Sequence, residues 1–104
     1  KRYVREGFKS DEELTLYDLL LKDNLTKPEL KKLKNVAIDL LAKIKHQLAC
    51  MDHPFDKRTT RATLIITIRD TLWQELPESY SEESINYYRD TIYNYVNQRY
   101  GGMA

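Results

Sequence analysis

The chain has 104 residues, of which 41% are hydrophobic and 32% are charged, and its net charge is +1. This length allows a single domain, and the apolar content supports a modest core while arguing against a disordered tail. Gly and Pro number three each, which argues against a β-sandwich or barrel with frequent turns. No apolar run approaches the about 20 residues of a membrane span.

We expect a cytoplasmic protein. The N-terminal residues lack the pattern of a secretory signal peptide. The single cysteine, Cys50, cannot form a disulfide within the chain, which is typical of a reducing compartment.

The small net charge conceals three regions of different sign. Residues 1–26 hold five basic and six acidic side chains, residues 27–69 hold ten and four, and residues 70–104 hold two and six. The net charges of these regions are therefore −1, +6 and −4. Only the middle region has an electrostatic case for a polyanionic partner.

The first predicted helix covers about residues 11–22. Ser10 and Glu13 have the spacing of a capping box, in which the serine accepts from the Glu13 amide and the glutamate reaches back to the N-terminal backbone. The helix face that follows is lined by Leu14, Tyr17, Leu20 and Leu21. Residues 1–9, before this cap, are expected to form a flexible lead-in.

The second predicted helix has the clearest amphipathic pattern. Thr26 and Glu29 form another capping box, and Pro28 lies in the first turn, where its missing N–H costs nothing. The apolar face over about 22 residues consists of Leu30, Leu33, Ala37, Leu40, Leu41, Ile44 and Leu48.

The segment 56–76 allows two interpretations. The β-branched run Thr63–Ile68 is compatible with a buried strand. Helical spacing fits the whole segment better and ends at Pro77. In that helix one face holds Ala62, Ile65, Ile68, Leu72 and Leu76, with Leu64 and Trp73 on its flanks.

A fourth helix begins at Ser81 with acidic residues in its first turn and ends at Gly101. Its apolar face is Ile85, Tyr88, Ile92, Tyr95 and Val96. The chain is thus predicted to be all-α, a small irregular bundle of about four helices in one domain over 1–104.

We do not expect an active site within this chain, because the one candidate nucleophile pair, Cys50 and His53, lacks an orienting third group. His46, Cys50 and His53 have spacings of four and three residues, but one cysteine and two histidines fall short of the usual metal ligand set. We therefore predict no metal site and no cofactor within the chain. Cys50 is interpreted as a small buried hydrophobe.

Several basic residues are candidates for binding phosphate. They are Lys31, Lys32, Lys43, Lys57 and Arg58. They are able to position a nucleic acid backbone without reading bases. Because no recognition-helix signature accompanies them, DNA contact is expected to be sequence-independent. A solvated helix face is the more usual role of lysines such as Lys31, Lys32 and Lys43.

Two further sets of residues suggest a protein partner. Arg58, Arg61 and Arg69 lie within about 60° of the predicted apolar face of the third helix. They are either internal ion pairs, with Asp70, Glu78 or an acid of the last helix, or contacts to a partner. Tyr87, Tyr93 and Tyr100 project off the apolar face of the last helix, as interface tyrosines do. The alternative is that they are ordinary exposed aromatic side chains or form a lid over the first predicted helix.

A pattern of order and spacing spans about residues 12–101. It comprises Glu12-Glu13-Leu14 with Tyr17-Asp18, Leu25-Thr26-Lys27-Pro28-Glu29-Leu30, Thr60-Arg61-Ala62, Ile68-Arg69-Asp70, Leu76-Pro77, Tyr80-Ser81-Glu82-Glu83, Tyr95-Val96 and Tyr100-Gly101. This pattern resembles the C-terminal end of the motor and restriction subunit of type I restriction-modification enzymes.

The resemblance implies that the chain is a helical fragment of a larger ATP-dependent endonuclease, which uses ATP and Mg²⁺ in other domains. The fragment would dock the motor onto the methyltransferase and specificity subunits, with auxiliary contact to double-stranded DNA. The alternative is a free-standing helical domain that binds nucleic acid or regulates another protein. Arg61, Arg69 and Asp70 match the family pattern, without a chemical role attached to them.

Overall fold

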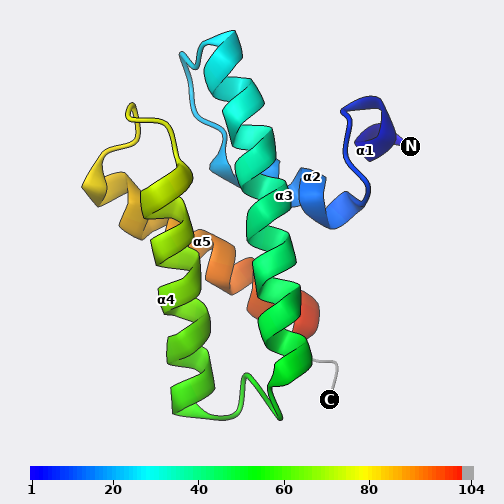
Figure 1. The fold of residues 1–104 in the computed structure, drawn as a ribbon, viewed down its shortest axis with the longest axis vertical. Coiled ribbons are helices and arrows are strands. Elements are labelled where there is room, and N and C mark those ends of the chain that lie inside the picture. Colours follow the sequence, from blue (N-terminus) through cyan, green and yellow to red (C-terminus); the bar gives the residue numbers. More distant parts are fainter. Residues whose placement is uncertain (102–104) are drawn as a thin grey trace.

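The computed structural model describes residues 1–101 of the chain. Within these residues the secondary structure is entirely helical, which confirms the predicted all-α bundle (Figure 1). The helices are α1 (Arg2–Arg5), α2 (Asp11–Leu20), α3 (Lys27–Cys50), α4 (Arg58–Glu75) and α5 (Glu82–Tyr100).

The two long helices α3 and α4 lie side by side and run in opposite directions, and the segment 51–57 joins them at one end (Figure 1). Helix α5 crosses behind both, and α2 packs against α3 and α5. The molecule measures 40 × 34 × 17 Å. The outer side of α4 therefore remains open to solvent.

The predicted caps set the starts of three helices. At α3 the Thr26 hydroxyl accepts from the Glu29 amide at 3.2 Å, and the Glu29 carboxylate accepts from the Thr26 amide at 3.0 Å. The other Glu29 oxygen accepts from the Ser79 hydroxyl at 2.6 Å. One capping residue therefore also fixes the connection between α4 and α5. At α5 the Ser81 hydroxyl accepts from the Ser84 amide.

The cap of α2 differs from the prediction in one bond. The Ser10 hydroxyl accepts from the Glu13 amide at 3.2 Å, as expected. The Glu13 carboxylate does not return to Ser10 but accepts from the amide of Lys9 at 2.8 Å. Glu13 is buried, so this bond compensates its lost hydration.

The segment Thr63–Ile68 is helical, so the helix interpretation is correct. Ile68, Leu72 and Leu76 are buried as predicted, but the buried face as a whole is rotated from the predicted one. The buried positions of α4 are Leu64, Ile68, Thr71 and Leu72. At 100° per residue, their mean direction lies about 75° from the face predicted from the sequence. Ala62, which was predicted on the apolar face, and Trp73, which was predicted beside it, are exposed instead.

Residues 1–9 do not form the flexible lead-in that the sequence predicted. Residues 2–5 form α1, and Phe8 is only 5% exposed and packs against Tyr17 with ring centroids 5.4 Å apart. The ammonium group of Lys34, on α3, donates to the Glu6 carbonyl at 2.9 Å. Burial of Phe8 thus attaches this segment to the domain.

The core lies between α2, α3, α4 and α5. Its fully buried large side chains are Leu16, Leu20, Leu33, Val36, Leu40, Ile44, Leu64, Ile68, Leu72, Ile92 and Val96. All of these except Leu64 belong to one continuous apolar cluster, which excludes water and is the main source of stability here. Within residues 1–101, the helices are too short or too polar to cross a membrane.

Candidate functional site

The candidate phosphate-binding residues do not form one patch. Lys31 and Lys32 are exposed near the start of α3, whereas Lys57 and Arg58 are exposed at the start of α4. Because the two helices are antiparallel, these pairs lie toward opposite ends of the molecule (Figure 1). The part of α3 from Lys32 to its last residue is about 27 Å long. A single phosphate cannot meet both pairs.

Lys43 is occupied by neighbouring carboxylates. Its ammonium group lies 3.0 Å from Asp39 and 3.1 Å from Glu75. The hydrogen bond with Glu75 lowers the pKa of Asp39, while burial raises the pKa of Glu75, and the hydrogen bond to Asp39 raises the pKa of Lys43. This lysine joins α3 to α4, and the arrangement argues against its prediction as a phosphate contact.

Arg61 is neither an internal ion pair nor a free interface residue. Its guanidinium donates to the Phe55 carbonyl at 2.8 Å, and the neighbouring Thr60 hydroxyl donates to the Pro54 carbonyl at 2.6 Å. Both bonds satisfy carbonyls of the α3–α4 connection, which lack helical partners. Arg61 therefore positions that connection in the described structure.

Arg69 is exposed on the outer side of α4. Its guanidinium lies 3.4 Å from the Asp70 carboxylate, and its central carbon is 5.7 Å from the centroid of the Trp73 ring. The pair with Asp70 is between neighbouring solvent-exposed residues and contributes little stability. The guanidinium thus remains accessible to another molecule.

Among the tyrosines of α5, Tyr87 has the side chain that is open to solvent. It is 64% exposed and meets Tyr88 edge to face, with ring centroids 5.2 Å apart. Tyr88 in turn meets the buried Tyr80 at 5.4 Å. This row holds the Tyr87 ring at the surface on a rigid base, as an interface aromatic requires.

Tyr93 and Tyr100 are used inside the fold. Tyr93 packs against Phe55 with ring centroids 6.4 Å apart, and its buried hydroxyl has no hydrogen-bond partner among the described residues. Tyr100 donates a hydrogen bond of 2.6 Å to the carboxylate of Glu12. Both predicted partner contacts are therefore largely engaged by the chain itself.

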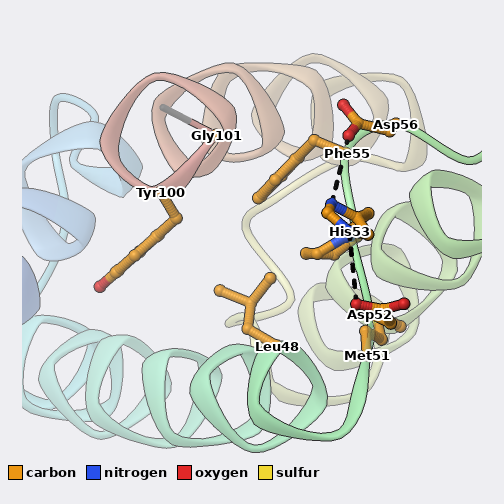
Figure 2. A pocket seen from close by; sticks show the side chains of 9 residues that line it. Leu48, Met51, Asp52, His53, Phe55, Asp56, Tyr100 and Gly101 are labelled. Atoms are coloured by element: carbon orange, nitrogen blue, oxygen red, sulfur yellow. Dashed lines mark ion pairs between the residues drawn. The ribbon is translucent and has the colours of Figure 1, made fainter. Parts of the chain in front are cut away.

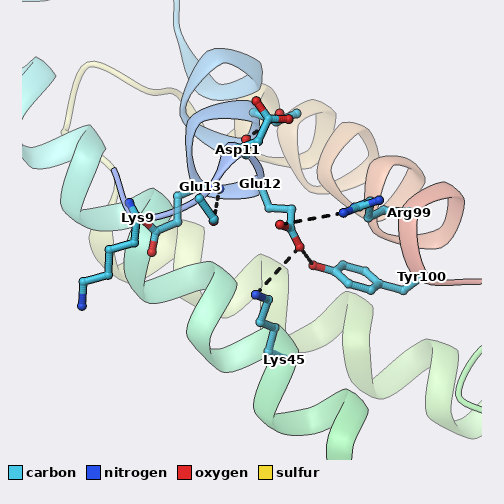
Figure 3. Close-up of polar contacts among 9 residues, drawn as sticks. Lys9, Asp11, Glu12, Glu13, Lys45, Arg99 and Tyr100 are labelled. Atoms are coloured by element: carbon cyan, nitrogen blue, oxygen red, sulfur yellow. Dashed lines mark hydrogen bonds and ion pairs between the residues drawn. The ribbon is translucent and has the colours of Figure 1, made fainter. Parts of the chain in front are cut away.

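Glu12 is the centre of a polar cluster that joins three helices (Figure 3). Its carboxylate accepts from Tyr100 of α5 and lies 3.8 Å from the Lys45 ammonium group of α3 and 3.9 Å from the Arg99 guanidinium. The bond from Tyr100, followed by the two cations, lowers the pKa of Glu12. Burial and the bond to Glu12 raise the pKa of Tyr100. The cluster fixes the ends of α5 and α2 on α3.

A cavity of about 360 Å³ lies between the end of α3, the α3–α4 connection and the end of α5 (Figure 2). Leu48, Phe55 and Tyr100 give it apolar walls. His53 lies at its rim, with its ring nitrogens 3.6 Å from the carboxylates of Asp52 and Asp56. Both carboxylates are strongly exposed, so these contacts are solvent-screened.

The interpretation of Cys50 as a buried hydrophobe is wrong. Its thiol is exposed at the end of α3, because the helix turns this position away from the core. Within residues 1–101, His, Cys, Asp and Glu side chains are not grouped in threes that suit a metal ion.

Sequence reasoning missed the roles of Glu12, Asp39 and Glu75. Glu12 lies in the first turn of α2 beside the capping residue Glu13, and no local pattern distinguishes it as the centre of a cluster. The pair of Asp39 with Lys43 has the readable spacing of four residues. The contact of Lys43 with Glu75 has no local signal, since 32 residues separate them.

Comparisons with protein-family models, with curated proteins and with solved structures found no match to this chain.

Proposed function

We propose that this chain is a non-catalytic assembly domain of the motor and restriction subunit of a type I restriction-modification enzyme. In this proposal it docks the motor onto the methyltransferase and specificity subunits in the cytoplasm. ATP and Mg²⁺ would serve the parent subunit elsewhere, where DNA is translocated and cut. The proposal rests on the resemblance described above and on the surface of α5.

The observation that carries the docking role is the position of Tyr87. A phenol ring that is 64% exposed leaves apolar surface in water, and a partner that covers it recovers that cost. The ring is also held in place by Tyr88, so little side-chain freedom is lost on binding. Large, rigid and amphipathic side chains of this kind are the residues on which protein interfaces depend.

The residues that carry the resemblance mostly build the fold. Thr26 and Glu29 cap α3, Arg61 holds the connection before α4, and Tyr100 binds Glu12. A shared pattern made of caps and tertiary contacts supports a shared fold. It assigns no chemistry to these positions, which suits a docking module rather than an active site.

The DNA contact in this proposal is auxiliary. It is limited to Lys31 and Lys32 at one end of the molecule and Lys57 and Arg58 at the other. Two pairs of cations neutralise few phosphates, so the affinity of the chain alone would be low at physiological salt. A strong autonomous interaction would favour the alternative of a free-standing nucleic-acid-binding domain.

The docking role is tested by binding the chain to the methyltransferase and specificity subunits encoded in the same genome. Titration calorimetry is performed with the wild type, with Tyr87→Ala and with Tyr87→Phe. We expect Tyr87→Ala to weaken binding about tenfold. Tyr87→Phe retains the ring and is expected to bind nearly as the wild type does.

The folding control is the melting temperature, which Tyr87→Ala should leave unchanged because the side chain is exposed. The docking proposal fails if the wild type does not bind the two subunits. It also fails if Tyr87→Ala binds as tightly as the wild type. DNA that binds the isolated chain tightly at physiological salt would establish the free-standing alternative instead.

A further inference from the structure

The outer side of α4 carries two large apolar side chains in water. Ile66 is 56% exposed and Trp73 is 51% exposed. They are seven residues apart and therefore share one direction on the helix, opposite the buried face centred on Leu64 and Ile68. Neither side chain is used by the core of the domain. Their exposure is a cost that burial against another surface would remove.

Arg69 and Asp70 lie between these two side chains. Together the four residues form a continuous strip, which we name the α4 stripe: Ile66, Arg69, Asp70 and Trp73. The arginine lies beside the Trp73 ring, and the contact between the two charges is 3.4 Å long and solvent-exposed. Both charges are thus free to exchange this partner for another.

The order of the residues along the α4 stripe indicates which molecule binds to it. Its midpoint falls between Arg69 and Asp70, so a two-fold axis at that point places an antiparallel copy of α4 with each residue facing its complement. Ile66 then faces Trp73 of the second copy, and Arg69 faces Asp70 of the second copy. Apolar groups meet apolar groups and each charge meets its opposite, which is the condition for an isologous interface.

We propose that the α4 stripe is the contact surface of a homodimer, in which two copies of this chain pack α4 against α4 in antiparallel orientation. This dimer is independent of the docking role of Tyr87, which lies on α5.

The dimer is expected to be weak and reversible. The exposed face from Thr59 to Trp73 is about 21 Å long. A helix pair of this length buries an area at the lower end of specific interfaces. Association is therefore expected to depend strongly on protein concentration.

Sedimentation velocity of the chain from about 10 μM to about 1 mM tests the proposal, over the range in which such interfaces dissociate. We expect a monomer–dimer equilibrium in the wild type. Trp73→Asp should abolish it, with an unchanged melting temperature because the side chain is exposed.

Exchanging the charges of Arg69 and Asp70 tests whether the partner of the stripe is a second copy of the chain. Arg69→Glu places a carboxylate opposite Asp70 of the second copy and should raise the dissociation constant at least about tenfold. The double variant R69E/D70R restores opposite charges across the two-fold axis and should recover the wild-type constant to within about threefold. Arg58→Glu makes the same charge change on α4 outside the stripe and should leave dimerisation unaffected.

Three results would overturn the homodimer. The first is a wild type that remains monomeric at every concentration. The second is an R69E/D70R variant as defective as R69E, which would mean that Arg69 and Asp70 do not pair between the two copies. The third is an effect of R58E equal to that of R69E, since net charge rather than pairing would then govern association.

Discussion

The hydroxyl of Tyr100 lies 2.6 Å from the carboxylate of Glu12, although 88 positions separate them in the chain. The bond joins the last residue of α5 to the first turn of α2, and Lys45 of α3 and Arg99 lie close to the same carboxylate. A hydrogen bond to a charged acceptor is stronger than one between neutral groups. Closure of the bundle therefore depends on a residue close to the end of the described chain.

Replacing Tyr100 with Phe removes this bond while leaving the ring in place. We expect a loss of about 1–2 kcal/mol in the free energy of unfolding, because the Glu12 carboxylate loses its shortest partner. Urea unfolding followed by circular dichroism measures the loss. Tyr87→Phe removes an exposed hydroxyl from the same helix and should leave the stability unchanged. Equal losses in the two variants would show that the bond to Glu12 does not stabilise the fold.

The same bond makes part of the stability depend on pH. The pKa of Glu12 is lowered from 4.5 in the folded state, so its contribution is present above that value and is lost as the pH falls through the folded pKa. The pKa of Tyr100 is raised from 10.0, so its contribution is present below that value and is lost as the pH rises through the folded pKa.

The stability difference between wild type and Tyr100→Phe should therefore be constant from about pH 5 to about pH 9 and shrink on both sides. Unfolding by urea at a series of pH values measures it. A difference that stays constant down to about pH 2 would exclude an ionised Glu12 as the acceptor.

Substitution by alanine is expected to reduce the stability of the fold at Arg61 but not at Arg69. Arg61→Ala removes the donor to the Phe55 carbonyl and should cost about 1–2 kcal/mol. Arg69→Ala removes only an exposed contact and should change stability by less than about 0.5 kcal/mol. Both values come from urea unfolding at a concentration at which the chain is monomeric. A larger loss for Arg69 than for Arg61 would contradict the assigned contacts.

Ile66 and Ile68 test the orientation of α4. Ile68 is fully buried, and Ile68→Ala should cost about 2–4 kcal/mol through lost burial and the cavity left behind. Ile66→Ala should cost less than about 0.5 kcal/mol in the monomer, because its side chain is exposed. In a strand the two residues would share one face. Similar losses from both substitutions would therefore argue against the helix.

Lys31 and Lys32 test the auxiliary DNA contact. Removing both charges with K31Q/K32Q should reduce the slope of log affinity against log salt by about two. Lys43→Gln should leave the slope unchanged, because Asp39 and Glu75 already neutralise that lysine. Fluorescence anisotropy with a random-sequence duplex, at a series of salt concentrations, measures the slopes of both variants. An unchanged slope in the double variant would exclude these lysines from the contact.

Local patterns predicted most of the fold. The Thr26–Glu29 box located the start of α3, and the apolar spacing that followed identified Leu33, Leu40 and Ile44 as core residues. These features depend on residues within one or two turns of each other, so a single sequence contains them in full.

Two features were beyond local patterns. Helix α4 has apolar residues at several angles, and only packing against α3 and α5 decides that Leu64 and Thr71 face inward while Trp73 faces outward. The partners of Glu12, and the Glu75 partner of Lys43, come from other helices. Such contacts depend on the relative positions of helices, which periodicity does not specify.

The double use of Glu29 links two events in unfolding. Its carboxylate holds both the first amide of the α3 cap and the hydroxyl of Ser79, fifty positions further along the chain. Fraying of the first turn of α3 therefore also removes one of the bonds that hold the turn leading into α5. Local opening at the start of α3 is in this way coupled to local opening at the start of α5.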